Sequence, residues 1–232
     1  MSPKLKFQLN ISLDIQTGTQ FLSRSKAGID FGAGIVKHYP ELTIAQYKDH
    51  KEKGEIVREF VEKYYQTNKQ ELDEALIIMQ NNWEEVEDNF YFVVDKIFEG
   101  FPWPPGQYVC YLSIFDCNPR FLDTKTFQVY YKSKIGTNHV VAHEMLHFIF
   151  YDYVEQKEKD LAERIGKDRL WVLSEVFDKL AFEHPIFEKF KPKFQGGYPE
   201  IKTLQDQLHD KLNGQPFTIK KFLVATENTK LT

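Results

Sequence analysis

Residues 139–150 read HVVAHEMLHFIF, an almost wholly apolar stretch that still carries ionisable side chains. A helix turns by about 100° per residue, so His143, Glu144 and His147 would share one arc of its surface. The other directions are apolar, and a helix that is apolar almost all round is buried. Burying three polar groups together is costly unless something satisfies them. The stretch therefore predicts a buried helix built around a polar site.

The spacing of these side chains is that of H-E-x-x-H. Two neutral imidazoles four positions apart can ligate one zinc ion, with the intervening glutamate beside the metal-bound water. The alternative is a core helix whose histidines only bind hydrogen-bonding neighbours. That alternative explains neither the spacing nor Glu144, so we expect His143 and His147 to ligate Zn²⁺.

A catalytic zinc usually has three protein ligands and a water molecule. Glu175 is the candidate for the third ligand, because it lies inside the apolar stretch WVLSEVFD at 171–178. The alternative is an exposed glutamate on the wet side of an amphipathic helix. The competing carboxylates lie in a charged stretch or beside Pro185, and they are Glu155, Glu158, Glu163 and Glu183.

Two segments resemble the zincin metallopeptidases, and within them the gluzincins. The segment 141–149, VAHEMLHFI, fits the extended zincin motif, and 173–177, LSEVF, is similar to the glutamate-helix motif L-N-E-x-F-A. The resemblance implies hydrolysis of peptide or protein substrates, with Glu144 as general base and acid. In one branch of the family an Asp four positions after the glutamate orients a zinc histidine, and Asp178, three positions after Glu175, is the candidate for that role here.

The chain departs from both branches of that family. Residue 178 is Asp where the aminopeptidase-like branch has Ala, and residue 179 is Lys where the thermolysin-like branch has its orienting Asp. The exopeptidase motif G-A-M-E-N is missing from the sequence, and the chain is short for either branch. We therefore expect a compact, minigluzincin-like enzyme.

Gluzincins also use a Tyr or His to stabilise the oxyanion. The catalytic candidates for that role are His184 and Tyr198, with His209 as a third. His139 lies one turn before His143 and has no counterpart in the family. The segment 116–122 is the candidate for an edge strand that pairs with extended substrate.

The resemblance and the hydrophobic pattern together predict an α+β, zincin-like fold. We expect a single catalytic domain over 1–232, with a mixed sheet and backing and active-site helices in an upper lobe (1–152) and a mostly helical lower lobe (153–232). The periodicity predicts strands over 5–15, 108–115 and 127–131. It predicts helices over 54–64 and 69–97, one capped by Thr137 or Asn138, one from Asp168 to Pro185, and one carrying Leu204, Leu208 and Leu212. Residues 16–26 read as a polar connection, the segment with Gly28, Gly32 and Gly34 as irregular, and Gly196-Gly197 as a loop.

Composition limits the partners. The net charge of −4 lacks a dense basic stripe, so we expect no nucleic-acid partner. No apolar run approaches the ~20 residues of a membrane span, and the N-terminus does not read as a signal peptide. The two cysteines, Cys110 and Cys117, are few for a secreted scaffold, although a disulfide between them is open. We expect a cytoplasmic protein, monomeric in preference to oligomeric.

Two other functions stay open at this stage. One is a catalytically silent zincin-fold protein that acts in binding or regulation, and the other is a helical interaction protein in which the motif is accidental. Intact His143, Glu144 and His147 weigh against the first, and the Glu175 segment weighs against the second. The sequence gives neither the cleavage specificity nor the choice between endopeptidase and exopeptidase.

Overall fold

The chain folds around a mixed four-stranded sheet. The computed structural model describes residues 2–193, 198–212, 216–227 and 229. The strands of the sheet are β1 (Leu5–Leu9), β4 (Tyr108–Ser113), β5 (Arg120–Phe121) and β6 (Thr126–Tyr130), in the order β1-β4-β6-β5. Strands β1 and β6 both run parallel to β4, while β5 runs antiparallel to β6 at the edge. The predicted α+β class and the mixed sheet are confirmed.

Helices make up most of the remaining structure. Before the second strand of the sheet come α1 (Ile11–Phe21), α2 (Phe31–His38), α3 (His50–Thr67), α4 (Lys69–Glu84) and α5 (Glu87–Ile97). After the sheet come α6 (Thr137–Lys157), α7 (Lys159–Glu183), α8 (Lys202–Leu212) and α9 (Ile219–Glu227). Short 3₁₀ segments lie at Pro40–Tyr47, Pro185–Phe190 and Pro199–Ile201. Helix α7 is kinked at Gly166, whose φ of 77° is non-helical.

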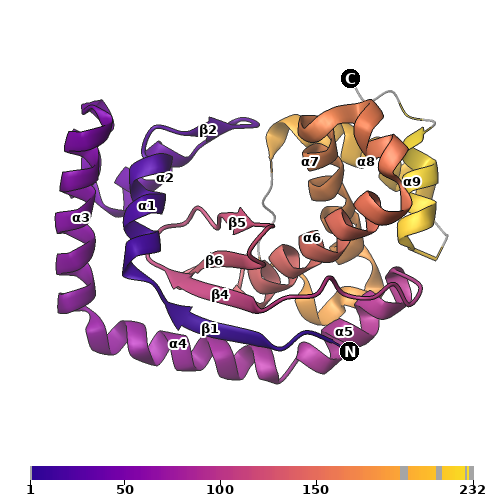
Figure 1. Ribbon diagram of the computed structural model, residues 1–232, viewed down its shortest axis with the longest axis horizontal. Coiled ribbons are helices and arrows are strands. Elements are labelled where there is room, and N and C mark those ends of the chain that lie inside the picture. The colour runs from indigo at the N-terminus through magenta and orange to yellow at the C-terminus, as the bar shows by residue number, and fades with distance from the viewer. Residues whose placement is uncertain (1, 194–197, 213–215, 228, 230–232) are drawn as a thin grey trace.

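The arrangement of the layers brings α6 and α7 together beside the sheet. Helix α4 lies along β1, whereas α6 packs on β6 and against α7 (Figure 1). Helix α1 approaches the core closely at Gly18, where an added Cβ would lie 2.8 Å from the Phe115 ring. Large buried aromatic side chains such as Trp83, Phe127 and Phe150 fill the interior. The buried face of α6 is thereby fixed between the sheet and the C-terminal helices.

The predicted strand over 5–15 is wrong beyond Leu9. The Asn10 side chain accepts a hydrogen bond from the Leu13 amide and starts α1 at Ile11. A local cap of this kind satisfies a backbone amide of the first helical turn. It therefore overrides the alternating pattern, which continued to Ile15 by chance.

The predicted connection 16–26 and the irregular glycine segment are also corrected. Helix α1 runs to Phe21, and a hairpin of β2 (Ser25–Lys26) and β3 (Ile29–Asp30) follows it. The Asp30 side chain then accepts from the Ala33 amide and caps α2, which contains two glycines. Two glycines weaken a helix locally, but the cap and packing support it.

Three smaller expectations can be compared with the structure. Helix α6 does begin at Thr137, but Gly136 precedes it without a side-chain cap. Cys110 and Cys117 are both buried free thiols, so the open disulfide is not formed. The Gly196-Gly197 loop lies outside the described residues. None of the helices in the described part of the chain has the length and apolar character needed to span a bilayer.

Candidate metal centre

Helices α6 and α7 supply the side chains of the predicted site. His143, Glu144 and His147 come from α6, and Glu175 comes from the second half of α7. Both helices bury these positions because their neighbours are apolar, including Val141, Leu146, Phe148, Leu173 and Phe177 on either side. His147 is fully buried, while the side chain of His143 is 20% exposed and lines a cavity described below.

The distances among the three predicted ligands match those of a tetrahedral metal site. The Nε2 atoms of His143 and His147 lie 3.1 Å apart. Glu175 Oε2 lies 3.5 Å from His143 Nε2, and Glu175 Oε1 lies 3.4 Å from His147 Nε2. Metal–ligand bonds of about 2.0–2.2 Å at tetrahedral angles would hold donors roughly 3.3–3.5 Å apart. One donor atom from each of the three residues lies within 4.8 Å of the others.

The charge of the cluster also fits a divalent cation. Glu144, Glu175 and Asp178 are buried carboxylates, and Arg120 is the guanidinium that contacts two of them. With neutral imidazoles and all three carboxyl groups ionised, the cluster holds more negative charge than the Arg120 guanidinium balances, although Lys26 and Lys179 also attract Glu175. Buried charges are costly unless they are paired or bind a metal. A divalent cation held by His143, His147 and Glu175 would balance this excess.

The site also holds polar atoms without satisfactory partners. Within the described part of the chain, His147 Nδ1 and both carboxylate oxygens of Asp178 are buried and make no well-directed hydrogen bond. Two imidazole nitrogens that face each other at 3.1 Å can share only one proton. A metal would accept lone pairs from both rings at once, which is the arrangement that these residues fit.

Burial shifts the pKa values of the cluster toward its neutral forms. Desolvation lowers the pKa of His143 and His147 well below the usual value, so both imidazoles are in the neutral state that ligates metals. Desolvation raises the pKa of Glu175, with Arg120 opposing it. Desolvation likewise raises the pKa of Glu144 to about 7, again against Arg120. A carboxyl group poised there suits proton transfer at neutral pH.

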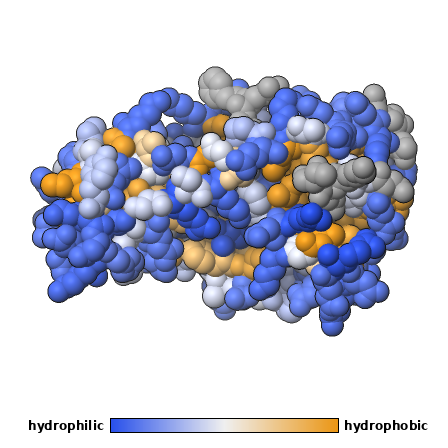
Figure 2. All heavy atoms as spheres, turned by 90° about the horizontal axis from the view of Figure 1, so that it is seen from above, coloured by the Kyte–Doolittle hydropathy of each residue, from blue (hydrophilic) through white to orange (hydrophobic). Residues whose placement is uncertain are grey.

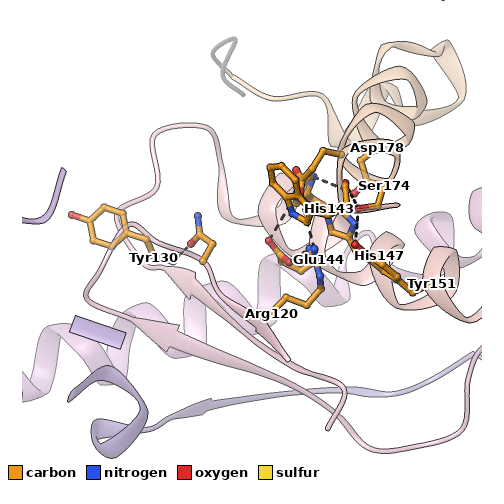
Figure 3. Close-up of polar contacts among 11 residues, drawn as sticks. Arg120, Tyr130, His143, Glu144, His147, Tyr151, Ser174 and Asp178 are labelled. Atoms are coloured by element: carbon orange, nitrogen blue, oxygen red, sulfur yellow. Dashed lines mark hydrogen bonds and ion pairs between the residues drawn. The ribbon is translucent and has the colours of Figure 1, made fainter. Parts of the chain in front are cut away.

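Asp178, three residues after Glu175 on α7, lies close to both histidines of α6. Its Oδ2 is 3.2 Å from His143 Nδ1 and also 3.2 Å from His147 Nε2, and the side chain is fully buried (Figure 3). These distances are within hydrogen-bond reach, although the directions are poor. Of the two, the contact to His143 Nδ1 is the useful one, because it leaves the Nε2 of that ring for a metal.

Arg120 is the residue of the site that sequence reasoning missed. It stands on the edge strand β5, and its Nη1 donates to Glu144 Oε2 at 2.8 Å while its Nη2 lies 3.8 Å from Glu175 Oε1 (Figure 3). Its side chain is only 12% exposed. A signal was present, since Arg120 is the only arginine in the predicted edge segment 116–122. Nothing in the spacing linked it to Glu144.

The remaining predicted site residues divide into two groups. Tyr198 lines the cavity at the metal centre, with its ring edge-on to Trp171 at 4.9 Å. His184 does not reach the site: it caps the following 3₁₀ segment through the Ile186 amide. His209 is exposed on α8 and lies 4.0 Å from Glu183. These positions leave Tyr198 as the one described candidate among the three that faces the cavity.

His139 has a structural role and also lines the cavity. Its Nδ1 lies 2.8 Å from the Phe190 carbonyl oxygen, and its ring packs edge-on against Phe182. Burial lowers the pKa of His139 to about 4. The ring is therefore neutral near pH 7, and it contributes a wall to the cavity without adding charge.

A cavity of about 570 Å³ opens in front of the metal centre. His143, Glu144 and Glu175 line one side, and Asp116 to Arg120 line another. Within the predicted edge segment 116–122, Arg120 and Phe121 form β5, which pairs with the sheet on one side only among the described strands, so the edge position is confirmed for these two residues. Its pairing with substrate stays a prediction. The volume lies in the range of about 300–1,000 Å³ that is typical of ligand pockets.

Comparison of the chain with protein-family models, with curated proteins and with solved structures found no match.

Proposed function

We propose that this protein is a zinc-dependent metallopeptidase of the gluzincin type. The observation that carries the proposal is the placement of Glu144 beside a three-donor cluster, at the wall of an open cavity that an edge strand also lines. Two imidazoles and a carboxylate suit zinc. A purely structural zinc site would have a fourth protein ligand and no opening to a cavity.

The residues divide the chemistry among them. His143, His147 and Glu175 would hold the ion, and Asp178 would fix the orientation of the His143 ring through Nδ1. When bound, zinc acidifies water and polarises a substrate carbonyl. Glu144 accepts the proton of the attacking water and returns it to the leaving amine. Strand β5 offers backbone groups to an extended peptide.

Arg120 keeps Glu144 in a defined orientation. Its hydrogen bond takes Oε2, and it is a charge-assisted bond of the stronger kind. Oε1 has no such bond from Arg120 and lies 3.9 Å from His143 Nε2, on the side of the ligands. One oxygen is thereby anchored while the other is available for proton transfer. Tyr198, across the cavity, is the candidate for stabilising the oxyanion.

The same ion pair favours one alternative. A carboxylate held by a buried arginine could be locked away from water, which would leave a zinc-binding protein that is catalytically silent. Both functions predict a bound metal, and they differ only in whether peptides are cleaved.

The test combines metal analysis with cleavage of a mixed peptide library. We expect about one zinc per chain, peptide cleavage, and inhibition by a chelator that added zinc reverses. The Glu144→Gln variant should retain the metal and lose activity by about 10²–10⁴-fold. Arg58→Gln changes an exposed ion pair on α3, outside the cavity. It is the control and should bind zinc and cleave peptides as the wild type does. A loaded protein that cleaves no library peptide would favour the silent alternative, and a protein that binds no zinc would contradict both.

A further inference from the structure

The β2–β3 hairpin extends across the molecule from the α1–α2 side toward α7 (Figure 1). We call residues 25–30 the strap. Its turn residues Ala27 and Gly28 both have positive φ, at 48° and 83°, which is the geometry of a tight two-residue hairpin. The strap is thus a defined hairpin that projects from its own side of the cavity.

The strap touches the opposite side at two points. The Lys26 ammonium lies 3.6 Å from the centre of the Trp171 ring, on the helix that bears Glu175. At the tip, a Cβ added to Gly28 would lie 3.5 Å from the Cγ and Cδ atoms of Pro199. Trp171 in turn packs against Tyr198. The strap therefore spans from one wall of the cavity to the other.

The strap also forms part of the cavity lining. Lys26, Ile29 and Asp30 line the same cavity as His143, Glu144 and Glu175. Seen from above, this face is mainly hydrophilic, with apolar patches between the polar side chains (Figure 2). A peptide bound along β5 would consequently lie between the edge strand and the strap.

The contacts of the strap are too weak to hold it permanently closed. Each of its strands has two residues, and an isolated short hairpin is marginally stable in water. A single cation–π contact is a weak interaction, and it is weaker where solvent reaches it. Lys26 is partly exposed, so its contact with Trp171 can break and reform without unfolding the protein.

We propose that the strap restricts this site to short or unfolded peptide segments, which enter in extended form when the strap lifts. The inference rests on the proposed function. A folded domain cannot place a loop deep in a cavity that is bridged from both walls, whereas a single extended chain fits into the narrow opening that forms when the strap lifts. The cavity volume of about 570 Å³ holds only a short segment at a time.

A reversible lock provides the test. A Cβ at Gly28 would lie 3.7 Å from Pro199 Cβ, close to the mean Cβ–Cβ distance of about 3.8 Å in disulfides. The variant Gly28→Cys/Pro199→Cys should therefore cross-link the strap when oxidised. The native thiols, Cys110 and Cys117, are buried and should not interfere. Adding Glu144→Gln prevents turnover, so that binding of a labelled decapeptide can be followed by fluorescence anisotropy.

We expect the association rate of the decapeptide to fall at least 10-fold on oxidation and to recover with reductant. Gly28→Cys alone is the control for redox effects and should show no change. Equal rates in the oxidised and reduced forms would overturn the proposal. Because binding is measured without turnover, this result is independent of the cleavage assay that tests the proposed function.

A second experiment covers the case in which the cross-linked protein does not fold. The decapeptide sequence is placed in a loop of a rigid folded host, and its binding is compared with that of the free peptide. We expect the protein with the wild-type strap to bind the free peptide at least 10-fold more tightly than the same sequence in the folded host. Lys26→Ala, which removes the contact with Trp171, should narrow that preference, whereas Lys48→Ala should not. Equal binding of folded and free forms to the wild-type strap would contradict the proposal.

Discussion

The carboxylate of Asp14 and the carboxylates of the candidate metal centre are all buried, but their hydrogen-bonding needs are met in different ways. Asp14, fully buried on α1, accepts hydrogen bonds from the Ser113 hydroxyl at 2.5 Å and the Ile114 amide at 3.2 Å. It also accepts from Tyr65 and Gln128, each at 2.7 Å. The protein itself provides every partner that this carboxylate needs, and the group ties α1 to α3 and to strands β4 and β6.

The candidate metal centre lacks such donors. Asp178 is as deeply buried as Asp14, yet in the described structure neither of its oxygens makes a well-directed hydrogen bond. Among the described carboxylates of this cluster, Arg120 forms ion pairs with Glu144 and Glu175 but not with Asp178. This difference shows that the burial of a carboxylate does not by itself indicate a metal-binding site. A buried carboxylate with a full set of donors is structural, whereas a cluster short of donors fits a cation from outside the chain.

The largest effect that would separate the two clusters is expected for Glu175→Ala. Loss of this carboxylate removes a proposed ligand and should weaken zinc binding more than about 100-fold, beyond the effect of losing a supporting partner. Glu183→Ala, at the exposed end of α7, is the matched control and should bind zinc as the wild type does. Competition titration with a chelating dye measures both. Similar affinities for the two variants would remove Glu175 from the site.

Asp14→Asn should give the next largest effect, and on stability alone. An asparagine amide would direct its NH₂ at groups that are already donors, so we expect a loss of about 2–3 kcal/mol in the free energy of unfolding. Urea denaturation of the zinc-loaded protein measures the loss. Asp73→Asn, an exposed control, should change it by less than about 0.5 kcal/mol. Reduced zinc affinity in folded Asp14→Asn protein would break the distinction between the clusters.

Asp178→Asn should weaken zinc binding by about 10–100-fold, because a neutral amide replaces the charged partner of the His143 ring while the ligands stay. The exposed Asp210→Asn serves as control. Stability of the metal-free form should rise, since an uncompensated buried carboxylate is removed. If the metal-free variant is instead less stable than the metal-free wild type, Asp178 belongs with Asp14 as a structural group.

The smallest effect concerns pH. Burial raises the pKa of Asp14 from 3.8 to about 6, against the hydrogen bonds that lower it. Between pH 4 and 6 the native state therefore binds more protons at this group than the unfolded state does. Stability contributed by Asp14 is present at low pH and declines as pH rises through this window.

The decline amounts to at most about 1.4 kcal/mol per pH unit. We expect the difference in unfolding free energy between wild type and Asp14→Asn to shrink between pH 4.5 and 5.5, as measured by urea denaturation at each pH. A difference that grows over that interval would contradict the raised pKa.

The contrast between the clusters also explains what the sequence could predict. His143, Glu144 and His147 share one helix, so the helical period alone predicts that they lie together. The apolar pattern of a second helix singles out Glu175 as the buried carboxylate. Arg120 approaches the same point from the sheet edge, a long-range contact that no local spacing encodes. The four donors of Asp14 likewise come from distant elements. The prediction of a strand reaching Ile15 failed for the opposite reason, because the Asn10 cap outweighed a regular pattern.

The position of β1 in the sheet has a consequence for synthesis of the chain. Leu5 pairs with Tyr108, and Leu9 pairs with Leu112. At about 5–20 residues per second, the ribosome needs roughly 5–20 s to add the hundred or so residues that separate these partners. During that time the hydrogen-bonding groups of β1 are open to other chains, as on any unprotected strand edge. Until β4 emerges, nascent chains of this protein are therefore expected to be prone to association through β1.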